Sequence, residues 1–217
     1  MEDGGTGRTD ATIFESHGLL TDQCVMAHGV WLTDTDLELL QRRQTAVAHC
    51  PLSNFFFAGG CLPTRRLLTR GNRVGLATDV AGGYSPSMWN ASRAAVVASR
   101  ALEHAQIITI HQAGTSPEPP GDNGTTFSSS SSSSSSPQLD YRHAFYLATL
   151  GGAEALNLAN HIGTFAPGME LDALVLTVAP PIQVFEQDTV ADVFQKLCVL
   201  GDDRHVASVY VQGRKVK

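Results

Sequence analysis

The stretch RVGLATDVAGG, Arg73 to Gly83, decides the fold, because its pattern recurs twice earlier in the chain. Its apolar run, Val74 to Ala77, is too short for a typical helix and is followed by a lone carboxylate, Asp79, and two glycines. A short apolar run bounded by turn residues is typical of a strand that is buried on both faces. The stretch therefore predicts a buried strand with an acidic side chain just beyond its end.

Two earlier stretches repeat this pattern. They are CVMAHG, Cys24 to Gly29, and TAVAHCP, Thr45 to Pro51, and each is followed by a helical pattern. Strands that alternate with helices predict an α/β fold with a parallel sheet and right-handed crossovers.

The helix boundaries follow from capping residues. Thr33 and Asp36 form a capping-box pattern for a helix through Gln41, and a short helix is expected over Pro63–Arg70. A long helix is expected after Ser85 as N-cap.

The second half of the chain changes character. Residues 114–137 are rich in serine, proline and glycine, so a disordered loop is expected there. A helical pattern then runs to about residue 159 and is interrupted at Gly151 and Gly152. The tail predicts a strand, a helix capped by Asp188, and a hairpin turning at Gln212 and Gly213, which together suggest a small separate β layer.

Composition narrows the class of protein. The chain has 217 residues, of which 42% are hydrophobic and 17% charged, with a net charge of -6. No apolar run approaches the roughly 18 residues that span a bilayer, and no basic stripe indicates nucleic-acid binding. The four cysteines form no CxxC pair, which favours reduced thiols in the cytoplasm. We therefore expect a small-molecule substrate or a protein partner, with no nucleic acid and no membrane.

Polar side chains stand where each of the three expected strands ends: His28, His49 and Asp79. The carboxyl ends of parallel strands form the edge that holds ligands and catalysts. A single histidine in such a place is more often structural, whereas two imidazoles and a carboxylate in register suit zinc or another divalent metal. The residues alone leave both interpretations open.

The motifs MAHGVWL, AHCPLSN and GLATDVAGGYS resemble, in order and spacing, the last three strands of the amidohydrolase superfamily barrel, and within it the guanine deaminase family most closely. The segments IGTFAPGMELDALVL and LGDDRHVASVYVQGRKV are similar to that family's closing segments. The resemblance implies about three strands of a (β/α)₈ barrel over residues 1–158 and part of a small β-sandwich over 159–217. The serine tract looks like an insertion.

The resemblance also implies roles for individual residues. Asp79 matches the eighth-strand aspartate, which binds zinc, contacts the substrate and takes a proton from the attacking water. His28 matches the sixth-strand histidine beside the reacting carbon, so both residues are implied as catalytic. The family keeps AHCP as a wall of the site, so His49 is left out of the metal set, and Cys50 is expected to be structural. Gly82 and Gly83 either leave room for a flat purine or only permit a tight turn.

The sequence departs from the family pattern in one respect. The family's zinc site also uses an HxH pair and a histidine followed three residues later by glutamate, and neither HxH nor HxxE occurs in this chain. We therefore expect a chain that resembles the C-terminal half of a guanine deaminase and is inactive alone.

The implied activity is zinc-dependent deamination of guanine to xanthine and ammonia in purine catabolism, with one Zn²⁺ per site and a homodimer in the intact family. The alternatives are a non-catalytic interaction or regulatory fragment, and an amidohydrolase acting on another aminated heterocycle.

Overall fold

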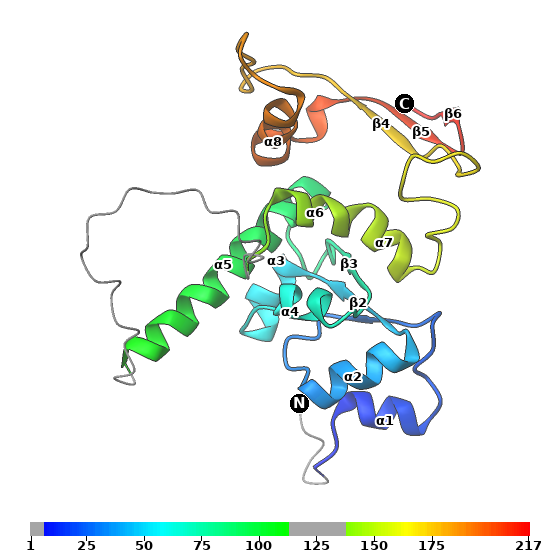
Figure 1. The fold of residues 1–217 in the computed structure, drawn as a ribbon, viewed down its shortest axis with the longest axis vertical. Coiled ribbons are helices and arrows are strands. Elements are labelled where there is room, and N and C mark those ends of the chain that lie inside the picture. Colours follow the sequence, from blue (N-terminus) through cyan, green and yellow to red (C-terminus); the bar gives the residue numbers. More distant parts are fainter. Residues whose placement is uncertain (1–6, 113–137) are drawn as a thin grey trace, which may run out of the picture.

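The computed structural model describes residues 7–112 and 138–217, without the side chains of residues 106–112. The disordered loop expected at 114–137 lies outside the described residues. Figure 1 shows a parallel sheet surrounded by helices, with a second sheet at the C-terminal end of the molecule. The strands are β1 (Val25–Ala27), β2 (Ala46–His49), β3 (Val74–Leu76), β4 (Ala173–Leu176), β5 (Val206–Val211) and β6 (Arg214–Lys215). The helices are α1 (Asp10–Ser16), α2 (Asp34–Arg43), α3 (Pro51–Ser53), α4 (Thr64–Thr69), α5 (Met88–Gln112), α6 (Tyr141–Ala148), α7 (Leu150–Ala155) and α8 (Val190–Leu200), with a π-helix η1 (Asn54–Ala58) and a 3₁₀ turn η2 (Asp203–His205).

The first sheet confirms the expected mixed α/β class. Its order is β1-β2-β3 and both pairings are parallel. The pairing aligns Ala27 with Ala48 and His49 with Leu76, so the three strands end at one edge of the sheet. That shared edge is where the sequence placed its polar side chains.

The core fills the space between this sheet and the surrounding helices. Val47 at the centre of β2 and Val74 in β3 are 0% and 1% exposed, and they belong to one apolar cluster with leucines of α2, α4 and α6. Burying a side chain of this size contributes about 1.5–3 kcal/mol. The central strand is therefore fixed by packing on both faces.

The helix starts differ from expectation at two places. The capping box of Thr33 and Asp36 is present at α2, as predicted. However, α5 begins at Met88, and the Ser85 hydroxyl instead accepts hydrogen bonds from the Ser87 backbone and the Asn90 amide.

Helix α8 is capped by Thr189 and not by Asp188. The Thr189 hydroxyl accepts from the Asp192 backbone N–H, and the Asp192 carboxylate accepts from that of Thr189. This reciprocal pair satisfies two otherwise free N–H groups. Asp188 forms an ion pair with Lys196 instead.

The helical break also lies elsewhere, at Thr149, so Gly151 and Gly152 are inside α7. A Cβ on Gly151 would lie 2.9 Å from the Val74 carbonyl oxygen. The glycine therefore lets α7 approach β3 closely and does not end a helix.

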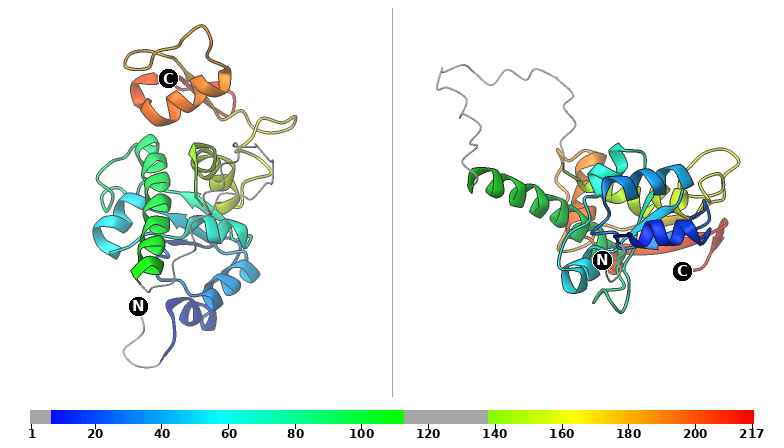
Figure 2. Two further views of the ribbon diagram at one scale, coloured as in Figure 1. Left: turned by 60° about the vertical axis from the view of Figure 1, so that its left-hand side comes forward. Right: turned by 90° about the horizontal axis from the view of Figure 1, so that it is seen from below.

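The C-terminal sheet has the order β4-β5-β6 and is antiparallel. Its hairpin turns at Gln212 and Gly213, which have φ values of 50° and 76°, as the sequence predicted. Arg93 of α5 connects this part to the rest, because its guanidinium donates to the carbonyl oxygens of Val199 and Gly201 at the end of α8. Figure 2 shows α8 beside the N-terminal end of α5. Within residues 7–112 and 138–217, none of the helices is long and apolar enough to cross a membrane.

Candidate active site at the strand ends

His28 is the first residue after β1, and the backbone turns sharply there. Its φ is 69° and that of Gly29 is 66°, so two consecutive residues adopt the left-handed conformation. Histidine adopts this conformation uncommonly, and such residues gather at functional sites. The His28 backbone N–H still donates to the Ala48 carbonyl oxygen at 3.0 Å. The turn therefore directs the imidazole away from the strand while the backbone stays paired.

Asn54 holds the His28 ring in place. Its Oδ1 lies 3.0 Å from His28 Nδ1, and Asn54 itself is 1% exposed. An amide oxygen can only accept, so Nδ1 carries a proton, and in the neutral ring the lone pair is on Nε2. The His28 side chain is 41% exposed, which leaves that lone pair available at the edge of the sheet.

Asp79 stands at the corresponding end of β3 and is also left-handed, with φ 48°. Two glycines permit the turn that follows. A Cβ on Gly82 would lie 2.6 Å from Asp79 Oδ2, and one on Gly83 would lie 2.0 Å from the Thr78 carbonyl oxygen. The position that a Cβ would take at each glycine is thus occupied by the chain's own atoms, which supports the tight-turn interpretation.

The two predicted catalytic side chains meet across the end of the central strand. His28 Nε2 lies 3.7 Å from Asp79 Oδ2, although β1 and β3 are separated by β2. Cys50, the residue after β2, lies between them in the strand order. Its Sγ, a ring nitrogen of His28 and a carboxylate oxygen of Asp79 are all within 4.8 Å of one another.

His49 is separate from this group. It is 1% exposed, and neither of its ring nitrogens has a hydrogen-bond partner. Burial lowers the pKa of His49 to about 4, so the ring is neutral at physiological pH. Leaving His49 out of the metal set stays a prediction.

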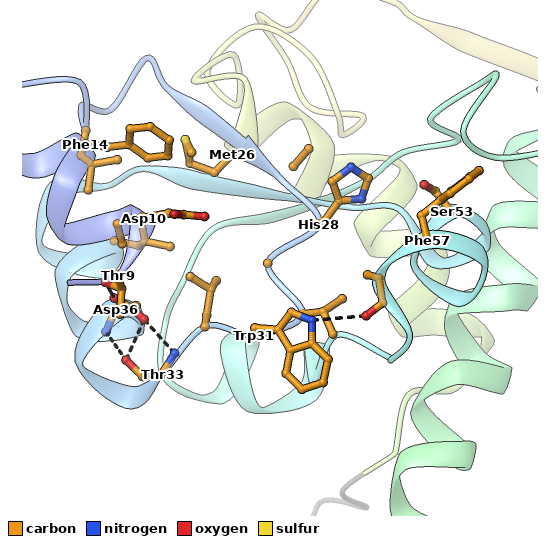
Figure 3. A pocket seen from close by; sticks show the side chains of 18 of the residues that line it. Thr9, Asp10, Phe14, Met26, His28, Trp31, Thr33, Asp36, Ser53 and Phe57 are labelled. Atoms are coloured by element: carbon orange, nitrogen blue, oxygen red, sulfur yellow. Dashed lines mark hydrogen bonds between the residues drawn. The ribbon is translucent and has the colours of Figure 1, made fainter. Parts of the chain in front are cut away.

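A cavity of about 1000 Å³ opens beside the pair. Figure 3 shows it extending from His28 at the end of β1 and Phe57 of η1, past Met26, to Phe14 of α1. Its lining is mainly apolar, and its volume matches that of small-molecule sites. Carboxylate and imidazole thus lie at one end of an apolar cavity.

Two exposed aromatic rings line the cavity, and two more, from residues close in sequence to others that line it, meet each other. Trp31 and Phe57 line it and are 67% and 75% exposed, and the Trp31 indole N–H donates to the Ala58 carbonyl oxygen at 3.2 Å (Figure 3). Tyr84 meets Phe56 edge to face, with the ring centroids 5.7 Å apart. Flat apolar faces of this kind suit stacking on a planar ring.

The structure brings His28 and Asp79, which the sequence singled out, close together, and their catalytic roles stay a prediction. The sequence did not indicate Asn54 as the partner of the imidazole. It also treated Cys50 as purely structural, although the residue lies beside both. The signal that could have found Cys50 is its position directly after a strand, the same signal that identified His28. Asn54 is the first residue of the π-helical turn η1, whose geometry the sequence does not show.

Comparisons with known proteins agree on one family. The family model described as "Amidohydrolase family" matches residues 1–116 and 121–216. The guanine deaminase of Dictyostelium discoideum is 33% identical over 208 residues, which are 94% of this chain and 40% of that protein.

Two solved structures are similar over the same extent. E. coli guanine deaminase superposes with a TM-score of 0.74 at 27% identity, covering 94% of this chain and 41% of that one. Guanine deaminase from C. acetobutylicum, with bound guanine in the active site, gives 0.70 at 25% identity, covering 95% and 42%. The chain thus spans about two fifths of the length of these proteins.

Proposed function

Because this chain belongs to the amidohydrolase family, we propose that it takes part in the hydrolytic deamination of guanine to xanthine and ammonia. The observation that carries the proposal is the meeting of His28 and Asp79 at the carboxyl edge of the parallel sheet, 3.7 Å apart at the mouth of an apolar cavity. Catalytic groups occupy this edge in parallel α/β enzymes.

The donor atoms at this edge fit the zinc ion that the family uses. Two ligands on one tetrahedral zinc lie about 3.3–3.6 Å apart, given bonds of about 2.0–2.2 Å to nitrogen and oxygen. The 3.7 Å between His28 Nε2 and Asp79 Oδ2 is close to that spacing. Asp79 would hold the ion through its carboxylate, and the ion would supply a water acidified enough to react at neutral pH.

Asp79 also moves the proton in this proposal. A carboxylate beside the reacting water accepts its proton and then gives it to the departing amine, which leaves as ammonia. His28 presents the unprotonated Nε2 towards the same place because Asn54 fixes its tautomer. His28 can therefore orient the attacking water by accepting a hydrogen bond.

The cavity and its aromatic rim suit a flat, aminated ring. Trp31 and Phe57 provide exposed faces beside His28. Gly82 also lines the cavity, and a Cβ there would meet Asp79 and Ser53. Recognition of the purine would then depend on stacking here and on polar groups outside this chain.

The chain's own residues supply only part of such a site. They contain neither HxH nor HxxE, and they span about two fifths of the family members compared. We propose that residues 1–158 form the last part of a (β/α)₈ barrel and residues 159–217 part of a β-sandwich. A homodimer, one Zn²⁺ per site and a cytoplasmic setting complete the proposal, and the four free cysteines suit that setting.

The experiment is a chimera in which this chain replaces the matching segment of the Dictyostelium discoideum guanine deaminase. We expect it to form xanthine from guanine and to lose that activity with a chelator, whereas the 217-residue chain alone forms none. A folded chimera without activity would contradict the proposal and favour a non-catalytic fragment. Activity on adenine, cytosine or an aminotriazine in place of guanine would favour another amidohydrolase.

A further inference from the structure

Three potential metal ligands from three different strand ends converge in this chain. A ring nitrogen of His28, Sγ of Cys50 and a carboxylate oxygen of Asp79 lie within 4.8 Å of one another. Imidazole, thiolate and carboxylate are the three side-chain groups that bind zinc in proteins. We propose that Cys50 is a metal ligand, and that this chain by itself, which contains neither HxH nor HxxE, holds a zinc-class divalent cation through His28, Cys50 and Asp79. In this separate chain His28 Nε2 binds the ion, whereas in the complete site of the proposed function it orients the water.

The orientation of His28 is the second observation behind this proposal. Metal-binding histidines usually donate their other ring N–H to an oxygen acceptor, which fixes the ring and raises the basicity of the ligating nitrogen. The contact of His28 Nδ1 with Asn54 Oδ1 at 3.0 Å is an interaction of this kind. The free Nε2 is the nitrogen that lies 3.7 Å from Asp79.

The burial of Cys50 favours ligation over nucleophilic chemistry. Cys50 is 2% exposed and does not line the cavity, so a substrate there would not reach its sulfur. His28 Nδ1 faces Asn54 and Nε2 faces Asp79. Neither ring nitrogen is therefore positioned to take the proton of the Cys50 thiol, as nucleophilic chemistry would need. A cation could still contact the sulfur from the side of His28 and Asp79.

The geometry needs only a small adjustment. Sulfur and nitrogen ligands of one tetrahedral zinc lie about 3.6 Å apart, so separations of up to 4.8 Å must close by about 1 Å. The thiol donates to the Ala48 carbonyl oxygen at 3.4 Å, and metal binding replaces this hydrogen bond as the thiol proton leaves to solvent. Three protein ligands leave the fourth position open towards the cavity, as in catalytic zinc sites.

This inference rests on the proposed function only in placing the metal at the same edge, and it is tested without measuring activity. The purified chain is titrated with Co²⁺ under reducing, oxygen-free conditions, and the near-ultraviolet charge-transfer band from thiolate to cobalt is recorded. We expect the band in the wild type and in Cys61→Ser, a matched control outside the cluster. It should be absent from Cys50→Ser.

Two further variants test the other ligands. Asn54→Ala should weaken Co²⁺ binding about 10–100-fold, the usual effect of removing the partner of a ligating histidine. Asp79→Asn should also weaken binding, but the band should return at saturating Co²⁺ because the sulfur remains.

A second measurement avoids variants that fail to fold. X-ray absorption of the Zn²⁺-loaded wild-type chain should show one sulfur at about 2.3 Å from the metal. Only nitrogen and oxygen neighbours, no binding of either metal, or a charge-transfer band that survives Cys50→Ser would each overturn the proposal. If the chimera is inactive but the 217-residue chain shows the sulfur contact, only the proposed function is contradicted. If the chimera is active but the chain lacks the sulfur contact, only this inference is contradicted.

Discussion

The ends of β1 and β2 each place a histidine after an apolar run, yet the structure gives the two opposite environments. His28 has left the strand in a left-handed turn, is 41% exposed at its side chain and is held by Asn54. His49 is still paired within β2 and is 1% exposed, and neither of its ring nitrogens has a hydrogen-bond partner. Strand β1 ends before its histidine, whereas β2 continues through His49. This difference of one residue places His28 at the candidate site and His49 in the core.

The largest expected effect is a difference in catalytic activity between variants of Asp79 and of His49. In the chimera, Asp79→Asn should lower kcat/KM for guanine about 10²–10⁴-fold, the usual contribution of a positioned acid–base group. His49→Gln should lower it far less, because the buried imidazole touches neither the cavity nor Asp79. Steady-state rates of xanthine formation provide the comparison. Equal losses in the two variants would mean that His49 belongs to the site.

The second effect concerns His49 and pH. Its pKa is lowered to about 4 in the folded chain, below the ordinary value of about 6.5 that the unfolded chain has. As the pH falls from about 6.5 to 4, His49 is therefore protonated in the unfolded state but not in the folded state, so the free energy of unfolding decreases. The total loss is about 3 kcal/mol, from 1.36 kcal/mol per pKa unit.

Urea unfolding of the chain at several pH values measures this slope. His49→Leu should remove most of it, since no titrating group remains at that position. His104→Gln is the matched control, because His104 is exposed on α5 and its replacement should leave the slope unchanged. A slope that persists in His49→Leu would assign the pH dependence to another group.

Much of the fold could be predicted because it depends on local patterns. The three apolar runs, the capping box at Thr33 and the turn at Gly213 act within a few residues, and all three are confirmed. The start of α5 and the cap of α8 were wrong because neighbouring residues compete for the same role. Ser85 bonds with Ser87 and Asn90, and Thr189 displaces Asp188.

The site could be predicted only in part. His28 and Asp79 stand at strand ends, so their meeting follows from the parallel pairing. The contact between Asn54 and His28 depends on a π-helical turn, and the environment of Cys50 depends on three separate strands. Periodicity carries no information about contacts of this kind, which is why the sequence left Cys50 as structural.

The smallest expected effect concerns the two glycines after Asp79, and it sharpens the comparison by moving a site residue without removing it. In Gly82→Ala the new methyl group would lie 2.6 Å from Asp79 Oδ2 and 3.1 Å from Ser53 Oγ, so the Asp79 carboxylate must shift. A misplacement of about 1 Å can cost up to about 10²-fold in rate, and we expect a loss of up to that size in the chimera. Thermal unfolding should change little, because the obstruction is a side chain that can move.

Gly83→Ala is the counterpart, since its methyl group would lie 2.0 Å from the Thr78 carbonyl oxygen and the backbone turn itself must give way. That variant should lose stability together with activity. If Gly82→Ala kept full activity, the position of the Asp79 carboxylate would not matter to the reaction. The proposed catalytic role of Asp79, and with it the contrast with the buried His49, would then be contradicted.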